Sequence, residues 1–238
     1  ILMPQTTTPG ELPSIDAARR NRLLKDVLKG VSRSFYLTLC ILPKPLREPI
    51  GLAYLLARTA DTIADRRQAR FTQARLEALV AFRSQVAGPA DSGVLENITS
   101  NSLDSESSPE EQALFDSLVD SFALLESLDA ADQEQVRWVV ITLTEGIEMD
   151  LTVFPDADSG ALAALPNGAY LDRYTYLVAG CVGEFWTAVT AAHTLSLKGL
   201  DLAKMSELGV RFGKALQLTN ALRDIPGDLR NGRCYLPA

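Results

Sequence analysis

The chain has 238 residues, of which 47% are hydrophobic and 22% are charged, and its formal net charge is −7. This composition indicates a globular protein with a substantial core and excludes an intrinsically disordered chain. The acidic balance argues against nucleic acid as the main partner. Three cysteines without CxxC spacing predict a reduced, cytoplasmic setting.

Neither a secretory signal nor a membrane span is evident. The first residues are polar and contain proline, unlike a signal peptide, and no apolar run reaches the ~18 residues that a bilayer requires. We therefore expect a cytoplasmic protein. A peripheral contact with the inner membrane surface is the alternative if the substrate or product is strongly apolar. The oligomeric state is not predicted.

The helical pattern begins after a loose leader over residues 1–14. Ser32 is a candidate N-cap for a short helix that Pro43 and Pro45 would end. Apolar residues then recur with helical spacing. Helices are predicted over about 46–65 and 71–86, followed by a long loop over 88–109 that is rich in Gly, Ser, Asn and Asp.

The second half of the chain also follows a helical period. Ser108 precedes a proline and two glutamates, so it marks a helix start, and Asp129 is a candidate cap for the next helix. Helices are expected over about 109–128, 130–152 and 167–197, and from 201 through Asp224, and no strand alternation is evident. We expect a single all-α domain over residues 1–238, a helical bundle around a central cavity.

Asp61 and Asp65 lie four residues apart on an otherwise apolar predicted helix. At about 100° per residue, Tyr54 and Arg58 share their face. Like charges at this spacing destabilise a helix, and a polar stripe cannot be buried without partners. A metal or a charged ligand would satisfy the stripe. A solvated stripe with an Arg58–Asp61 ion pair is the alternative.

A second acidic cluster lies near the end of the last predicted helix. Asn220, Asp224 and Asp228 offer oxygen ligands at successive turns, and Gln217 shares their face. Mg²⁺ prefers oxygen ligands and is usually bound by a few carboxylates together with phosphate oxygens of the substrate. Pro226 is expected to kink this turn, and surface charge pairs are the alternative to a metal site. Arginines suited to phosphate lie close by in the sequence: Arg223, Arg230 and Arg233.

Spacing alone does not identify a site. Asp116 and Asp120 repeat the four-residue spacing without arginine or amide neighbours on their face, so we expect both to be solvated. A third segment poses a different question, because Gly180 and Gly183 stand within a predicted helix, where each costs up to ~1 kcal/mol relative to alanine. They make room for a close neighbour, either another helix or an alkyl chain.

Five segments together resemble the squalene/phytoene synthase family. The resemblance implies an all-α isoprenoid-synthase fold with the two aspartate motifs on facing helices. It also implies further helices beyond the position of Ala238. The segments follow the family's order: Val31–Phe35, Tyr54–Asp65, Gly146–Leu151, Tyr174–Gly183 and Gln217–Pro237.

The resemblance assigns roles to individual residues. Tyr174 or the released diphosphate is the candidate to accept or relay the departing proton. Mg²⁺ and arginine would stabilise charge on the leaving diphosphate, and an apolar cavity would keep water from the allylic cation. The implied Mg²⁺ ligands are Asp61, Asp65, Asn220, Asp224 and Asp228. The implied substrate-binding residues are Ser32, Arg33, Arg58, Arg223 and Arg233 for diphosphate, Tyr54, Tyr174 and Gln217 near the reacting carbons, and Phe35 and Val178 along the cavity.

The implied activity is Mg²⁺-dependent head-to-head (1′-1) condensation of two farnesyl diphosphates. It would proceed through presqualene diphosphate and end with NADPH reduction to squalene. A phytoene or dehydrosqualene synthase, which needs no nicotinamide, is the first alternative. A catalytically idle helical binding protein of this fold is the second. Prenyl chain length is not predicted, because it depends on the side chains that close the cavity.

Overall fold

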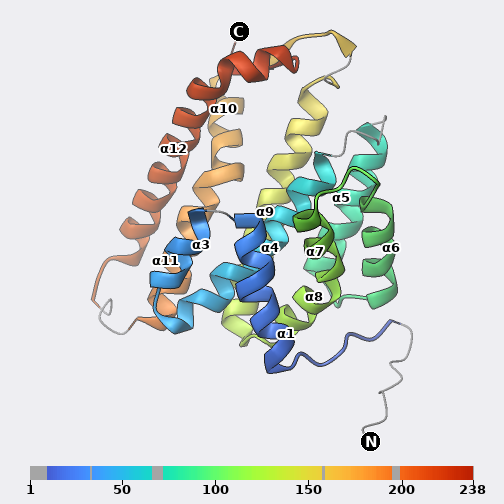
Figure 1. Ribbon diagram of the computed structural model, residues 1–238. Coiled ribbons are helices and arrows are strands. Elements are labelled where there is room, and N and C mark those ends of the chain that lie inside the picture. Colours follow the sequence, from blue (N-terminus) through green and yellow to red (C-terminus); the bar gives the residue numbers. More distant parts are fainter. Residues whose placement is uncertain (1–9, 33, 66–71, 157–158, 195–198, 238) are drawn as a thin grey trace, which may run out of the picture. The chain divides into compact units, whose positions relative to one another are not determined.

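The computed structural model describes residues 10–32, 34–65, 72–156, 159–194 and 199–237. They are largely helical, as predicted (Figure 1). The chain forms two compact units, one of Ile1–Arg66 with Ala78–Val140 and one of Arg67–Glu77 with Ile141–Ala238. Each unit has its own packing and is described by itself. No helix within the described ranges is both long and apolar enough to cross a membrane.

The first unit is built around one apolar helix, α4, which places Leu52, Leu56 and Ile63 in the core with no exposed surface. Pro43 precedes this helix and begins it, instead of only ending the one before. The helices of this unit, some shared with the second, are α1 (Ala17–Asn21), η1 (Arg22–Val27), α2 (Leu28–Ser32), α3 (Ser34–Ile41), α4 (Lys44–Ala64), α5 (Thr72–Ala87), α6 (Ser92–Ser102), α7 (Pro109–Asp116), α8 (Leu118–Ser127) and α9 (Ala130–Val153).

Two predicted helix caps are confirmed. The Ser108 side chain accepts from the Glu111 amide while the Glu111 side chain accepts from the Ser108 amide, which is a complete capping box. The Asp129 carboxylate accepts from the Asp132 amide at 2.9 Å at the start of α9. The helix predicted to run on to 128 is interrupted at Ser117, and α8 begins at Leu118. Local polar side chains therefore set these helix ends, as their sequence indicated.

The predicted loop over 88–109 is wrong in its central part, because residues Ser92–Ser102 form α6. Asp91 caps this helix by accepting from the Val94 amide at 3.0 Å. Leu95 and Ile98 are buried on its inner side, while most of the serines and asparagines lie at exposed or half-buried positions. Burial of an apolar face stabilises a helix more than weak propensity opposes it.

The second unit is helical with one small sheet. β1 and β2 pair in parallel, with Ala163 opposite Arg233, so the expectation of no strand is wrong for these short segments. The helix predicted over 167–197 ends at His193 and contains a π-helical stretch, η3; residues 195–198 lie outside the described ranges. The elements of the second unit that follow α9 are β1 (Ala163–Leu165), α10 (Gly168–Thr175), η3 (Tyr176–Gly180), α11 (Cys181–His193), α12 (Leu202–Arg230) and β2 (Arg233–Pro237).

The glycines of η3 and α11 make room for another helix. A Cβ atom built on Gly183 would lie 2.1 Å from the Gly209 carbonyl oxygen, and one on Gly213 would lie 2.3 Å from the Ala179 carbonyl oxygen. Because these distances are far below van der Waals contact, α11 and α12 touch through their backbones, and Figure 1 shows them side by side. Of the two sequence alternatives, close helix packing is confirmed.

Candidate active site

The polar stripe predicted on α4 is accessible, while most of that helix after its first turn is buried. Asp61 and Asp65 are exposed and Tyr54 and Arg58 are half-buried. Their helical neighbours Leu55, Leu56, Ala60 and Ile63 are at most 1% exposed. The stripe therefore lies at the edge of the first unit's core, where both carboxylates can reach a ligand.

Asp61 is the electrostatically unusual member of this stripe. Its pKa is raised to about 6, first by loss of hydration and then by repulsion from Asp65, and the positive charge of Arg58 opposes the shift without cancelling it. Asp61 keeps an exposed surface, so water still reaches it although the surrounding protein displaces much of its hydration. Two carboxylates held this close form a site that a cation would stabilise.

The raised pKa of Asp61 predicts how stability depends on pH. Between its ordinary value of 3.8 and about 6, the folded chain binds more protons than the unfolded chain, so this group's contribution to stability falls as pH rises through that window. Asp61→Asn should therefore be more stable than wild type at pH 7.5 without metal. The gain should fall below the ~1.4 kcal/mol per pKa unit of a fully buried group, because water screens the carboxylate.

Urea unfolding of both proteins in a chelator, at about pH 4, 5, 6 and 7.5, measures this difference. The advantage of the variant should be largest at the two higher pH values and shrink towards pH 4. An advantage that is equal at all four pH values would contradict the electrostatic origin.

An aromatic pair stands next to the α4 stripe. The rings of Phe35 and Tyr54 stack with centroids 4.8 Å apart, and the Tyr54 hydroxyl donates to the Val31 carbonyl at 3.3 Å. Ser32 does not cap α3, because its buried hydroxyl donates to the Leu28 carbonyl within the preceding helix. Arg33 lies outside the described residues.

The second acidic cluster lies along α12, as predicted. Asn220 and Asp228 are half-buried, Asp224 is exposed, and Gln217 is half-buried beside them. Burial and the negative charge of Asp224 raise the pKa of Asp228, whereas the charge of Arg233 lowers it. The helix passes through Pro226, and Figure 1 shows its last turns bending away from the earlier axis, which fits a proline kink.

Arg223 and Asp224 form the type of surface charge pair that was the sequence alternative. The guanidinium donates to the carboxylate through Nε at 2.8 Å and Nη2 at 2.6 Å, and this hydrogen bond holds the pKa of Asp224 below its usual value. Both side chains are exposed, and exposed pairs contribute little stability. Separating the two side chains therefore costs little free energy, which leaves Asp224 available to a cation and Arg223 available to a phosphate.

Tyr174 is buried in a tyrosine pair that the sequence interpretation did not include. Its ring stacks on Tyr235 at 4.9 Å, and burial followed by the negative charge of Asp150 raises its pKa above the ordinary tyrosine value. Arg233 donates to Asp150 at 2.6 Å. Val178 packs against Gly146, where a Cβ atom would lie 2.7 Å from the valine methyl. Asp150 and Tyr235 lie within the quoted segments, and that was the signal that could have identified them.

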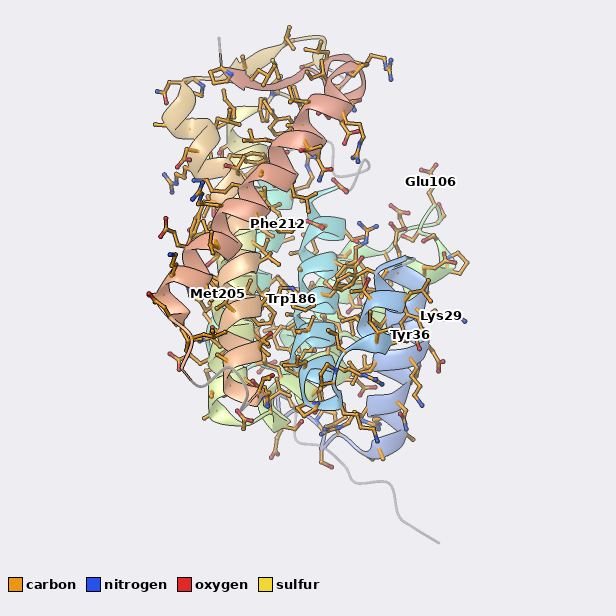
Figure 2. The ribbon with its side chains drawn as sticks, turned by 90° about the vertical axis from the view of Figure 1, so that its left-hand side faces the viewer. Lys29, Tyr36, Glu106, Trp186, Met205 and Phe212 are labelled. Carbon is orange, nitrogen blue, oxygen red and sulfur yellow. The ribbon has the colours of Figure 1, made fainter. Side chains whose placement is uncertain are left out.

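An apolar row continues the acidic row on the same helix. Leu208, Phe212 and Leu216 precede Asn220 at steps of four residues, so all lie on one ridge of α12. These three side chains are 47%, 72% and 52% exposed, and Figure 2 shows Phe212 on this helix. Sequence reasoning missed this row, although its four-residue spacing up to Asn220 is visible in the sequence.

The structure thus brings the predicted residues together within each unit. Tyr54, Arg58, Asp61 and Asp65 form one surface of the first unit. The second unit brings Tyr174, Arg233 and Asp228 close together, so that the charges of Arg233 and Asp228 act on the Tyr174 hydroxyl and on each other. That the two acidic faces oppose each other across a cavity stays a prediction, because each belongs to a different unit. Asp116 is exposed, as predicted, but Asp120 forms an ion pair with Arg19 at 3.3 Å.

Solved structures with this fold exist. A complex of TcSQS with a bound ligand superposes with a TM-score of 0.66 at 22% sequence identity, covering 92% of this chain and 58% of that one. A second TcSQS complex gives 0.64 at 23% identity, covering 88% and 54% of the two chains. This likeness confirms the class of fold, an all-helical synthase fold.

Sequence comparison then identifies the family. The squalene/phytoene synthase profile matches residues 28–238, and the chain belongs to this family. It is 32% identical over 209 residues to the presqualene diphosphate synthase of Rhodopseudomonas palustris, covering 88% of this chain and 60% of that one. It is 26% identical over 247 residues to the 15-cis-phytoene synthase of Synechocystis sp., covering 97% and 59%. The chain spans about 60% of the length of these relatives.

Proposed function

We propose that the protein joins two prenyl diphosphates head to head and releases the cyclopropylcarbinyl diphosphate, presqualene diphosphate when the substrate is farnesyl diphosphate. The observation that carries this proposal is the α12 ridge. Its first half is an exposed apolar row and its second half is a row of oxygen ligands. A substrate with a diphosphate head and an apolar tail matches these two adjoining surfaces. The diphosphate would lie at Asp224 and the tail along Phe212.

The donor set fits Mg²⁺, because its members are hard carboxylate and amide oxygens. Asp61 and Asp65 repel each other in the absence of a cation, and so do Asp224 and Asp228. When bound, Mg²⁺ would neutralise the diphosphate and favour its departure. The residues that would hold it are Asp61, Asp65, Asn220, Asp224 and Asp228.

The chain's own side chains would handle the diphosphate and the cation. Arg58, half-buried next to Asp61, and Arg223, whose forked group already binds a carboxylate bidentately, are suited to phosphate oxygens. The stacked pair of Phe35 and Tyr54 offers aromatic faces that stabilise an allylic cation.

The environment of Tyr174 bears on the proton that leaves as the cyclopropane closes. Burial and Asp150 raise its pKa, so its phenol stays protonated at neutral pH and is a poor base. It can still relay a proton through its hydroxyl group. Of the two candidates from the sequence, the released diphosphate is therefore the better final acceptor, with Tyr174 as the relay.

The relatives favour an activity without reduction over one that uses NADPH. Three of the similar proteins are presqualene diphosphate synthases, and others are phytoene synthases. The expected NADPH step is therefore not part of the proposed function. Phytoene or dehydrosqualene synthesis remains the second candidate, supported by the same comparisons.

Product analysis tests the proposal. The full-length protein is incubated with Mg²⁺ and farnesyl diphosphate, or geranylgeranyl diphosphate, each with and without NADPH, and the products are identified by mass spectrometry. We expect presqualene diphosphate from farnesyl diphosphate, in equal amounts with and without NADPH. Squalene formed only with NADPH, or a hydrocarbon formed without it, would replace the proposal by one of the alternatives. No turnover with either substrate would favour the idle binding protein.

A further inference from the structure

Asp150 is a carboxylate that accepts from two strong donors and that the proposed function assigns neither to the metal nor to the substrate. It lies near the end of α9, where the helix dipole disfavours negative charge, and its side chain is only 16% exposed. A charge in such a place costs free energy unless it is paired. The side chains that pair with Asp150 therefore indicate the role of this carboxylate.

Both carboxylate oxygens of Asp150 bind side chains of β2. Arg233 Nη1 donates to Oδ2 at 2.6 Å, and the Tyr235 hydroxyl donates to Oδ1 at 2.7 Å. These partners are distant in sequence, so the contact ties the end of α9 to β2. Hydrogen bonds to an ionised group are about twice as strong as neutral ones, which makes this a firm anchor.

The backbone of β2 is fixed on its other side. β2 pairs in parallel with β1, and Gly232, with φ of 76°, passes so close to Ala161 that a Cβ atom would lie 2.3 Å from its carbonyl oxygen. The Tyr235 ring then packs edge-on against Phe154 at 4.9 Å and stacks on Tyr174 at 4.9 Å. Asp150 thus completes a rigid frame around the two tyrosines.

We propose that Asp150 is a positioning residue: through Tyr235 it fixes the hydroxyl group of Tyr174, and through its second oxygen it fixes the guanidinium of Arg233. Tyr174 lies close enough to Asp150, Arg233 and Asp228 for their charges to act on its hydroxyl. The frame therefore holds the proton relay and one phosphate donor at the last carboxylate of the α12 ridge. This inference rests on the proposed function.

The test compares Asp150→Asn, Tyr235→Phe and the double variant of the full-length protein. Asp172→Asn is the matched control, because the Asp172 carboxylate lies in the same unit and is paired with Lys214. Three quantities are measured: kcat and KM with farnesyl diphosphate, the urea midpoint, and the near-UV circular dichroism of the tyrosines. Tyr235→Phe keeps the stacked ring and removes only the hydroxyl that binds Asp150.

We expect Asp150→Asn to lower kcat at least tenfold and to change the tyrosine signal, with Asp172→Asn like wild type in both. Tyr235→Phe should lower kcat with KM within about twofold of wild type. The double variant should be no more than about twofold slower than Asp150→Asn, because both changes break one contact. If the double variant lost kcat by the product of the two single losses, the positioning role would be overturned. It would also be overturned if the fall in kcat only followed the fall in the urea midpoint across the variants.

The two proposals fail in distinguishable ways. A wild-type protein without turnover would overturn the proposed function, and the tyrosine signal would then decide on the frame alone. A tyrosine circular dichroism signal that changes in Asp150→Asn but not in Asp172→Asn supports the frame. An unchanged signal in Asp150→Asn overturns it.

Discussion

Asp61→Asn and Asp224→Asn should each lower turnover at least about hundredfold while the protein stays folded. Asparagine nearly keeps the shape of aspartate but removes the charge that would bind Mg²⁺, and the loss of one electrostatic stabiliser of a developing charge typically costs 10²–10³ in rate. Both aspartates are exposed, so neither substitution leaves a cavity or an unpaired group in the core.

Asp116→Asn is the matched control for this experiment. Asp116 has the same four-residue spacing to a second aspartate, but it is exposed, and among the described residues its carboxylate accepts from Gln112 at 3.0 Å. Its turnover should stay within twofold of wild type. Steady-state rates over a range of Mg²⁺ concentrations, with circular dichroism as the check on folding, make the comparison. Near-normal turnover of either site variant at low Mg²⁺ would refute the metal assignment.

Gly183→Ala should cause the largest loss of stability among single-methyl additions in the second unit. The new Cβ would lie 2.1 Å from the Gly209 carbonyl oxygen, 2.2 Å from its carbon and 2.9 Å from its Cα. No side chain can rotate away, because these atoms are backbone, so α11 and α12 must separate. Overpacking typically costs 1–3 kcal/mol, and we expect about 3 kcal/mol or more here because a whole helix contact opens.

Urea unfolding of Gly183→Ala and Gly168→Ala measures this cost. Gly168 lies in the first turn of α10 and has no atom within 4 Å of a built Cβ, so alanine there should be neutral or slightly stabilising. Equal midpoints for the two variants would mean that the close contact between the helices is absent in solution.

The sequence predicted what depends on local patterning. The caps at Ser108 and Asp129 follow from short-range hydrogen bonds, and the exposed stripe on α4 follows from helical periodicity. The fold and family followed from the five quoted segments. The sequence predicts these features correctly because each is determined within a few residues of the chain or by side chains that share one helical face.

The features that the sequence did not predict depend on distant partners. The α6 segment looks like a loop until Leu95 and Ile98 find a core to enter. Ser32 looks like a cap, yet its hydroxyl binds back to Leu28 because the helix does not begin there. The roles of Asp150 and Tyr235 become visible only when β2 is placed beside the end of α9. Such tertiary contacts outweigh local propensity.

The backbone contact between Gly183 and Gly209 separates two demands on α12. One side of this helix is held by main-chain atoms, whose position does not depend on which side chains the helix carries elsewhere. The ridge through Leu208, Phe212 and Leu216 can therefore vary in volume while Asn220, Asp224 and Asp228 keep their places. Under the proposed function, an exchange of these apolar residues is expected to change the preferred prenyl chain length without moving the acidic row, and a library at these three positions tests this.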